Sequence, residues 1–116
     1  MAEAAKLTTH VLDTGSGKPA AGLTIELCAG HGGEAKALKS TQTNADGRCD
    51  GPLLSGDELR PGRYELRFHV GDYFRRTGTE GFYDIVPVPF VISNEKAHYH
   101  VPLLIAPFGY STYRGS

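Results

Sequence analysis

Features that mark special classes of protein are scarce in this sequence. It has two cysteines, one methionine and no tryptophan in 116 residues, so a disulfide-dense secreted scaffold is excluded. No segment approaches the ~20 consecutive apolar residues of a membrane helix. Neither sign of charge dominates, because the formal net charge is -1. That balance argues against a polybasic surface for nucleic acid or for a membrane.

The ends of the chain also lack targeting signals. Met1 to Lys6 is short and polar, without the apolar stretch of a signal peptide, and the last three residues are not a peroxisomal Ser-Lys-Leu. We therefore expect a soluble, cytoplasmic protein. Cys28 and Cys49 could pair with one another, but two reduced thiols are the better interpretation in that compartment.

Turn-forming residues, in contrast, are abundant. Fifteen glycines and seven prolines recur at intervals, which is typical of an all-β domain with many short strands. The length indicates a single domain over residues 1–116, large enough to bury a core without metal or disulfide staples.

Alternation of apolar and polar residues predicts where the strands lie. We expect strands over residues 7–13, 23–28, 35–43, 64–70, 86–93, 98–105 and 110–113. Pro87 and Pro89 cannot donate to a ladder, so the strand that contains them should be an edge strand or an irregular one, at least at its start. Residues 71–77 are the only helix that we expect. About seven or eight strands with one short helix favour closure as a two-sheet β-sandwich.

Five histidines in so small a domain suggest a functional site. His98 and His100 share one face of their predicted strand, because side chains two residues apart point the same way. With His10 they could form a zinc site, but such pairs are common in strands without metal, and we favour a metal-free interpretation. His31 and His69 are most simply surface residues.

Arg48 and the C-terminal segment are the other candidates. Arg48 follows a predicted turn over Asn44 to Gly47, and taken alone it is a solvated turn arginine. Its neighbour Cys49 could act as a nucleophile with a histidine partner, yet nothing local supports an activated thiol. The closing segment Tyr113-Arg114-Gly115-Ser116 is rich in ring and hydroxyl groups, which favours an ordered end over a frayed one.

Three segments together resemble the 5-hydroxyisourate hydrolases of the transthyretin-like family. LTTHVLD (7–13) with GKPA (17–20) resembles their N-terminal motif, TNADGR (43–48) their central turn, and HYHVPLL (98–104) with YRGS (113–116) their C-terminal block. The closing tetrapeptide is the most specific part. Transthyretin, the hormone carrier of the same fold, lacks it and also lacks the complete His/Arg/His set.

The resemblance implies a transthyretin-like (prealbumin-like) sandwich and an enzyme on the route from urate to allantoin. The reaction would hydrolyse 5-hydroxyisourate to 2-oxo-4-hydroxy-4-carboxy-5-ureidoimidazoline. By motif position the catalytic residues carry over to His10, Arg48 and His100, which would also contact substrate together with Tyr113 and Ser116. The resemblance further implies a homotetramer, a dimer of dimers with active sites in a channel between dimers, and no metal or other cofactor.

Three other functions remain open on the sequence alone. A transthyretin-like carrier would share the fold, and a zinc hydrolase could use His10, His98 and His100. A structural sandwich would leave the three motifs unexplained.

In the enzyme hypothesis a histidine deprotonates water, since its ordinary pKa lies near neutrality, while Arg48 anchors the substrate and stabilises the oxyanion. Which of His10 and His100 is the base stays open.

Overall fold

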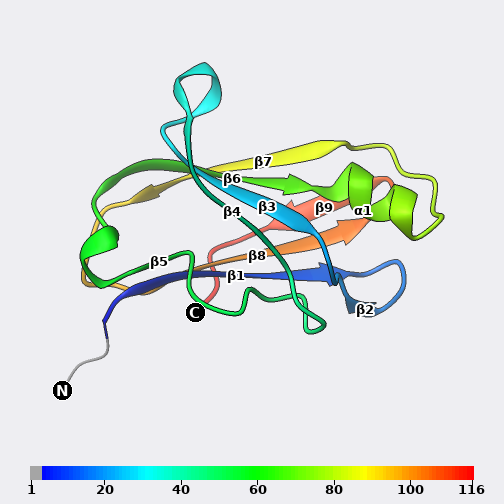
Figure 1. The fold of residues 1–116 in the computed structure, drawn as a ribbon, viewed down its shortest axis with the longest axis horizontal. Helices are drawn as coiled ribbons and strands as arrows, with labels where there is room; N and C mark the ends of the chain where they lie inside the picture. The colour runs from blue at the N-terminus through cyan, green and yellow to red at the C-terminus, as the bar shows by residue number, and fades with distance from the viewer. Residues whose placement is uncertain (1–3) are drawn as a thin grey trace.

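Two β-sheets packed face to face make up residues 4–116, which the computed structural model describes (Figure 1). The first sheet contains β1 (Lys6–Asp13), β2 (Lys18–Pro19), β5 (Leu54–Ser55), β8 (Tyr99–Ala106) and β9 (Gly109–Thr112). Its order is β2-β1-β8-β9, with β5 paired to β1. The second sheet, in the order β4-β3-β6-β7, contains β3 (Thr24–Ala29), β4 (Lys36–Gln42), β6 (Gly62–His69) and β7 (Ile85–Ile92).

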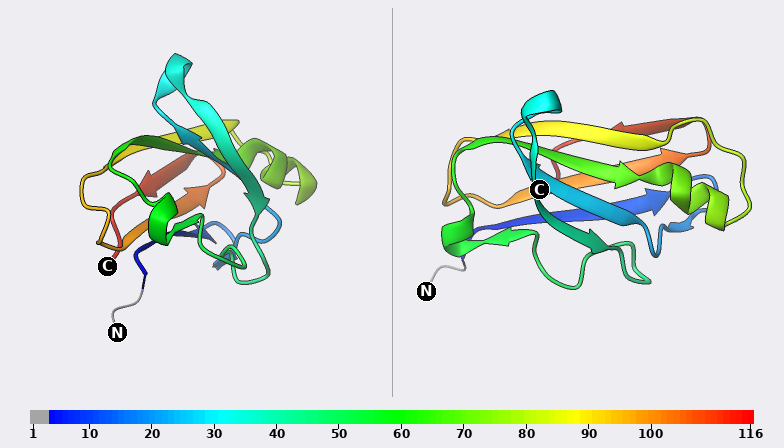
Figure 2. Two further views of the ribbon diagram at one scale, coloured as in Figure 1. Left: turned by 60° about the vertical axis from the view of Figure 1, so that its left-hand side comes forward. Right: turned by 45° about the horizontal axis from the view of Figure 1, so that its top comes forward.

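The predicted two-sheet β-sandwich is confirmed, and each predicted strand is present. The described residues form nine strands rather than seven or eight, because β2 and β5 are only two residues long and too short for a period to show. The one predicted helix is α1 (Val70–Arg76), which begins at the residue expected to end β6. Two 3-10 turns, η1 (Gly32–Glu34) and η2 (Gly56–Glu58), were not predicted. Figure 2 shows η1 at the tip of the β3–β4 connection, which projects beyond the sheets.

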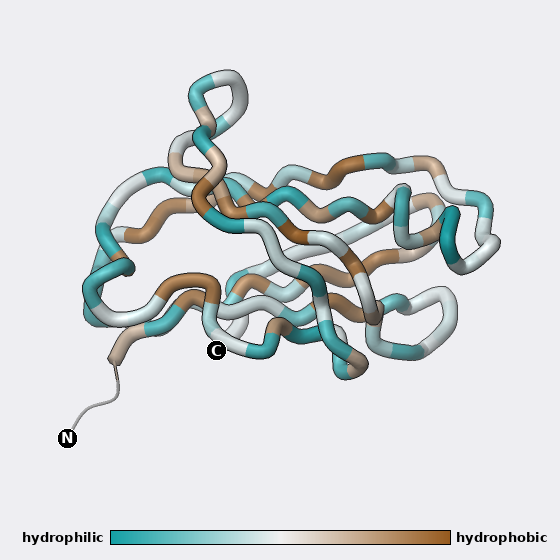
Figure 3. The backbone as a smooth tube through the Cα atoms, viewed as in Figure 1, coloured by the Kyte–Doolittle hydropathy of each residue, from teal (hydrophilic) through white to brown (hydrophobic). Residues whose placement is uncertain are grey.

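The core lies between the sheets and is supplied mainly by alternate residues of the longer strands, except β4, which has no buried residue. Ile25, Leu27, Leu66, Phe68 and Leu103 are all fully buried, and each such side chain contributes roughly 1.5–3 kcal/mol when it leaves water. Figure 3 shows the resulting alternation of apolar and polar residues along the strands. The other face of each sheet is left free for polar side chains.

The parallel pairing of β1 with β8 determines what the outer face of the first sheet carries. Thr8 stands opposite His100, and His10 stands opposite Pro102. On β1 the side chains of Leu7, Thr9 and Val11 are buried, whereas those between them are half-buried. The two histidines, far apart in the sequence, therefore lie on neighbouring strands and the same face.

The edge of the second sheet is β7, as its prolines predict. Pro87 and Pro89 are exposed and pair with β6 at alternate positions, so both missing N–H groups face away from the neighbouring strand.

His31 and His69, expected as plain surface residues, are instead half-buried and hydrogen-bonded. His31 accepts from the Nε of Arg63 at 3.1 Å, and His69 Nε2 lies 2.6 Å from a carboxylate oxygen of Glu26.

Two other expectations concern the cysteines and the membrane. Cys28 is buried, Cys49 is half-buried, and both are free thiols. The structure has no bond between these two cysteines, and their redox state in the cell stays a prediction. Of the helices within residues 4–116, none is long and apolar enough to cross a bilayer.

Candidate active site

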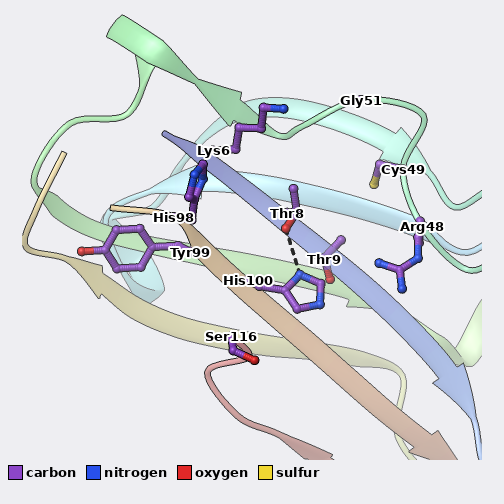
Figure 4. Close-up of a pocket in the computed structure, with 10 residues that line it drawn as sticks. All are labelled: Lys6, Thr8, Thr9, Arg48, Cys49, Gly51, His98, Tyr99, His100 and Ser116. Atoms are coloured by element: carbon purple, nitrogen blue, oxygen red, sulfur yellow. Dashed lines mark hydrogen bonds between the residues drawn. The ribbon is translucent and has the colours of Figure 1, made fainter. Parts of the chain in front are cut away.

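A cleft of about 590 Å³ opens over the outer face of the first sheet (Figure 4), a volume within the ~300–1,000 Å³ typical of small-molecule sites. Its lining residues come from β1, the segment after the 44–47 turn, β8 with the residue before it, and the C-terminal segment. They are Lys6, Thr8, Thr9, Arg48, Cys49, Gly51, His98, Tyr99, His100 and Ser116. Segments far apart in the chain thus meet at one place.

The turn over Asn44 to Gly47 positions Arg48 at this cleft. The side-chain oxygen of Asn44 accepts from the backbone N–H groups of Asp46 and Arg48, and Gly47 has a φ of +74°. A Cβ at Gly47 would lie 2.3 Å from the carbonyl oxygen of Val11, so only glycine lets the turn lie this close to β1. The turn is pinned there by a 2.8 Å hydrogen bond from the Val11 N–H to the Gly47 carbonyl.

His10 lies beside Arg48, with which it forms an isolated antiparallel bridge. Its Nε2 is 3.0 Å from the backbone carbonyl oxygen of Asp46. Because a carbonyl oxygen only accepts, Nε2 carries the hydrogen and donates it. The His10 ring is therefore held against the turn rather than among the residues that line the cleft.

His100 is half-buried within the cleft, and its Nδ1 lies 2.8 Å from the hydroxyl oxygen of Thr8. Burial lowers the pKa of His100 below its ordinary value of 6.5, and the nearby charges of Arg48 and His10 lower it further, while a hydrogen bond to the Thr8 backbone opposes them. The imidazole is therefore mainly neutral at pH 7. A neutral imidazole beside a guanidinium can accept a proton from water.

The C-terminal segment is ordered, as predicted, and it packs directly on His100. The Gly115 N–H donates to the carbonyl of His100 at 2.8 Å, and a Cβ at Gly115 would lie 2.6 Å from Cδ2 of the imidazole. The Arg114 guanidinium lies 4.4 Å from the ring centroid of Tyr99 and donates to the carbonyl of His98 at 3.2 Å. These contacts place Ser116 in the cleft lining.

The remaining candidates take different positions. Tyr113 is 58% exposed and does not line the cleft of this chain, so its role in binding substrate stays a prediction. Burial and the neighbouring Asp50 raise the pKa of the Cys49 thiol, which disfavours the thiolate that a nucleophile needs.

Within residues 4–116 no three His, Cys, Asp or Glu side chains are grouped to hold a metal ion. The zinc hypothesis for His10, His98 and His100 therefore has no geometric support.

Sequence reasoning missed Thr8. It precedes His10 by two residues and gives no signal of its own, because nothing local predicts which residue of a distant strand will stand opposite. Only the parallel register of β1 with β8 brings the Thr8 hydroxyl to His100.

Comparison with known proteins identifies clear relatives. The family model described as HIUase/Transthyretin matches residues 7–115. A 5-hydroxyisourate hydrolase of Mesorhizobium japonicum is 57% identical and matches 99% of this chain and 95% of its own length. The solved structure of Klebsiella pneumoniae 5-hydroxyisourate hydrolase is 40% identical with a TM-score of 0.82, covering 97% of this chain and 94% of that one. Transthyretin from Sparus aurata is 25% identical with a TM-score of 0.87, covering 95% and 96%.

Proposed function

This chain belongs to the HIUase/transthyretin family, and we propose that it hydrolyses 5-hydroxyisourate at the cleft around His10, Arg48 and His100. Relatives named 5-hydroxyisourate hydrolase are 57% and 50% identical and match 99% and 100% of the chain. The chain is accordingly a hydrolase of urate breakdown. The observation that supports this site is the meeting of a neutral imidazole and a guanidinium in one cleft.

The reaction needs a base and a cationic group. Water adds to a carbonyl carbon of the six-membered ring, the ring C–N bond breaks, and the nitrogen leaves with a proton. The carbon becomes a carboxylate, which gives 2-oxo-4-hydroxy-4-carboxy-5-ureidoimidazoline. Negative charge grows on the attacked oxygen, so a cation aimed at that oxygen lowers the barrier.

The side chains around the cleft divide these tasks. We assign the base to His100, since its lowered pKa keeps it neutral, and the proton taken from water is then available to the leaving nitrogen. Arg48 holds the ring edge with its planar fork of donors and stabilises the oxyanion. His10, whose Nε2 is engaged by the turn, contributes to substrate binding through its other edge, together with Ser116 and Tyr113.

The activity is tested with substrate generated in place from urate and urate oxidase. We expect the purified chain to accelerate the loss of 5-hydroxyisourate absorbance well above its spontaneous decay, and to do so after treatment with a strong chelator. Absence of acceleration, together with measurable binding of an aromatic ligand such as thyroxine, would favour a carrier function. Loss of activity with the chelator and recovery with zinc would favour the metal hydrolase.

We also propose that four chains assemble as a dimer of dimers. Support comes from a set of exposed aromatic residues, of which Phe82, Tyr83 and Tyr110 form a contiguous group. Monomeric proteins rarely leave large contiguous apolar patches in water. The members of the set are Phe82 (72% exposed), Tyr83 (41%), Phe108 (65%), Tyr110 (41%) and Tyr113 (58%). The rings of Tyr83 and Tyr110 already contact each other edge to face, with centroids 5.0 Å apart.

Sedimentation at micromolar concentration is expected to give a mass of four chains, and Tyr110→Asp should shift it toward smaller species because a carboxylate would be buried. A fully active monomer would contradict the tetramer.

The cytoplasmic location expected from the sequence stays a prediction.

A further inference from the structure

Thr8 contacts His100 from a strand that lies 92 residues away in the sequence. The two residues stand opposite each other in the parallel β1–β8 pair, and both side chains lie on the outer face of the sheet. Figure 4 shows the Thr8 hydroxyl over one edge of the imidazole, while the opposite nitrogen faces the side of the cleft where Arg48 lies. The hydroxyl is 2.8 Å from Nδ1 and is the one side-chain group that hydrogen-bonds this ring among the described residues.

The chemistry of the ring depends on which nitrogen carries the hydrogen. A neutral histidine has one donor and one acceptor nitrogen, and the hydrogen bond made by one nitrogen selects the role of the other. A base must present its lone pair to water. For His100 that lone pair has to be on Nε2, so Nδ1 must carry the hydrogen and donate it.

We infer that Thr8 is a positioning residue for the reaction: its hydroxyl oxygen accepts from Nδ1–H of His100 and so directs the Nε2 lone pair into the cleft. Thr8 thus acts through His100 and not on substrate, and the inference rests on the proposed function of this cleft.

His10 shows the opposite arrangement, which makes the two histidines distinguishable. Its Nε2 donates to the backbone carbonyl of Asp46, an acceptor that no side-chain substitution removes. The partner of His100 is a side chain, and it can be changed while the sheet pairing is kept. The charged and titratable groups that act on His100, which are Arg48 and His10, also stay in place.

The experiment compares Thr8→Val, which keeps the shape and removes the hydroxyl, with Thr8→Ser, which keeps the hydroxyl. We expect Thr8→Val to lower kcat by about 10-fold to 100-fold, by analogy with the loss of partners that orient metal-bound histidines. KM should change little, because the loss falls on the transition state. Thr8→Ser should retain most of kcat. Thr24→Val, the same change at a half-buried strand position of the other sheet, is the matched control and should match the wild type.

The position of the ring hydrogen is measured directly by two-bond ¹H–¹⁵N correlation of the imidazole, above the ordinary histidine pKa of 6.5. We expect the hydrogen on Nδ1 in the wild type and a shift toward Nε2 in Thr8→Val. A wild-type hydrogen on Nε2, or a Thr8→Val enzyme with unchanged kcat, would overturn the inference. The spectrum needs no substrate. An inactive wild type would therefore contradict the proposed function alone. The position of the ring hydrogen in the wild type and in Thr8→Val would still test whether Thr8 orients His100.

Discussion

Replacing His100 by glutamine is expected to lower kcat/KM for 5-hydroxyisourate by about 10²–10⁴-fold, which is the usual contribution of a positioned general base. Glutamine keeps a polar group in the half-buried position but cannot take a proton from water. The loss should appear in kcat, since proton transfer occurs only in the transition state. Initial rates with enzymatically generated substrate, corrected for spontaneous decay, measure it.

The matched control is His69→Gln. That histidine lies on β6 in the other sheet, bonded to Glu26, and glutamine can keep the bond. We expect wild-type kinetics from this variant. A His100→Gln enzyme that turned over like His69→Gln would show that the base lies elsewhere, and His10 would be the next residue to test.

Replacing Arg48 by glutamine is the second large effect. Loss of one donor to a developing oxyanion costs about 10²–10³-fold in kcat, and the substrate also loses a planar partner for its ring edge. Arg48→Lys should recover the charge but not the paired geometry, because an ammonium group is a point charge. We therefore expect the lysine enzyme to fall between glutamine and wild type.

The same substitution should change the pH profile in a defined direction. The base works only when neutral, so kcat/KM falls as pH drops through the pKa of His100, which burial first and then Arg48 and His10 hold below 6.5. Without the guanidinium, protonation of His100 is opposed less, and the acidic limb should move to higher pH. Arg60→Gln, an exposed arginine outside the cleft, should leave both rate and limb unchanged. An acidic limb that stayed in place in Arg48→Gln would contradict the effect of this charge on the pKa of His100.

The strands could be predicted because burial on one face imposes a period of two, which any half-buried strand shows. Leu7 to Asp13 and His98 to Ile105 carry that signal clearly, and β1 and β8 lie within one residue of those ranges. The two-residue strands β2 and β5 could not be found in this way. Each forms because its backbone pairs with β1, and its own composition does not predict that pairing.

The site was predictable as a set of residues but not as an arrangement. Motif resemblance selected His10, Arg48 and His100, and the structure brings all three to one side of the first sheet. The role proposed for Thr8 could not be predicted from the sequence, because it depends on the register between two strands near opposite ends of the chain. The exposed position of Tyr113 likewise depends on surroundings that no local pattern encodes.

The pairing of β1 with β8 also has a kinetic consequence. Closing a loop of this length is entropically costly, and contacts of large sequence separation tend to form slowly. The hydroxyl of Thr8 and the ring of His100, 92 residues apart, meet only when the two ends of the chain have found each other. During refolding the proposed base His100 thus meets Thr8 only when β1 pairs with β8, the pairing of largest sequence separation among the described strands. The recovery of turnover should therefore report the closure of the first sheet rather than the formation of the individual strands.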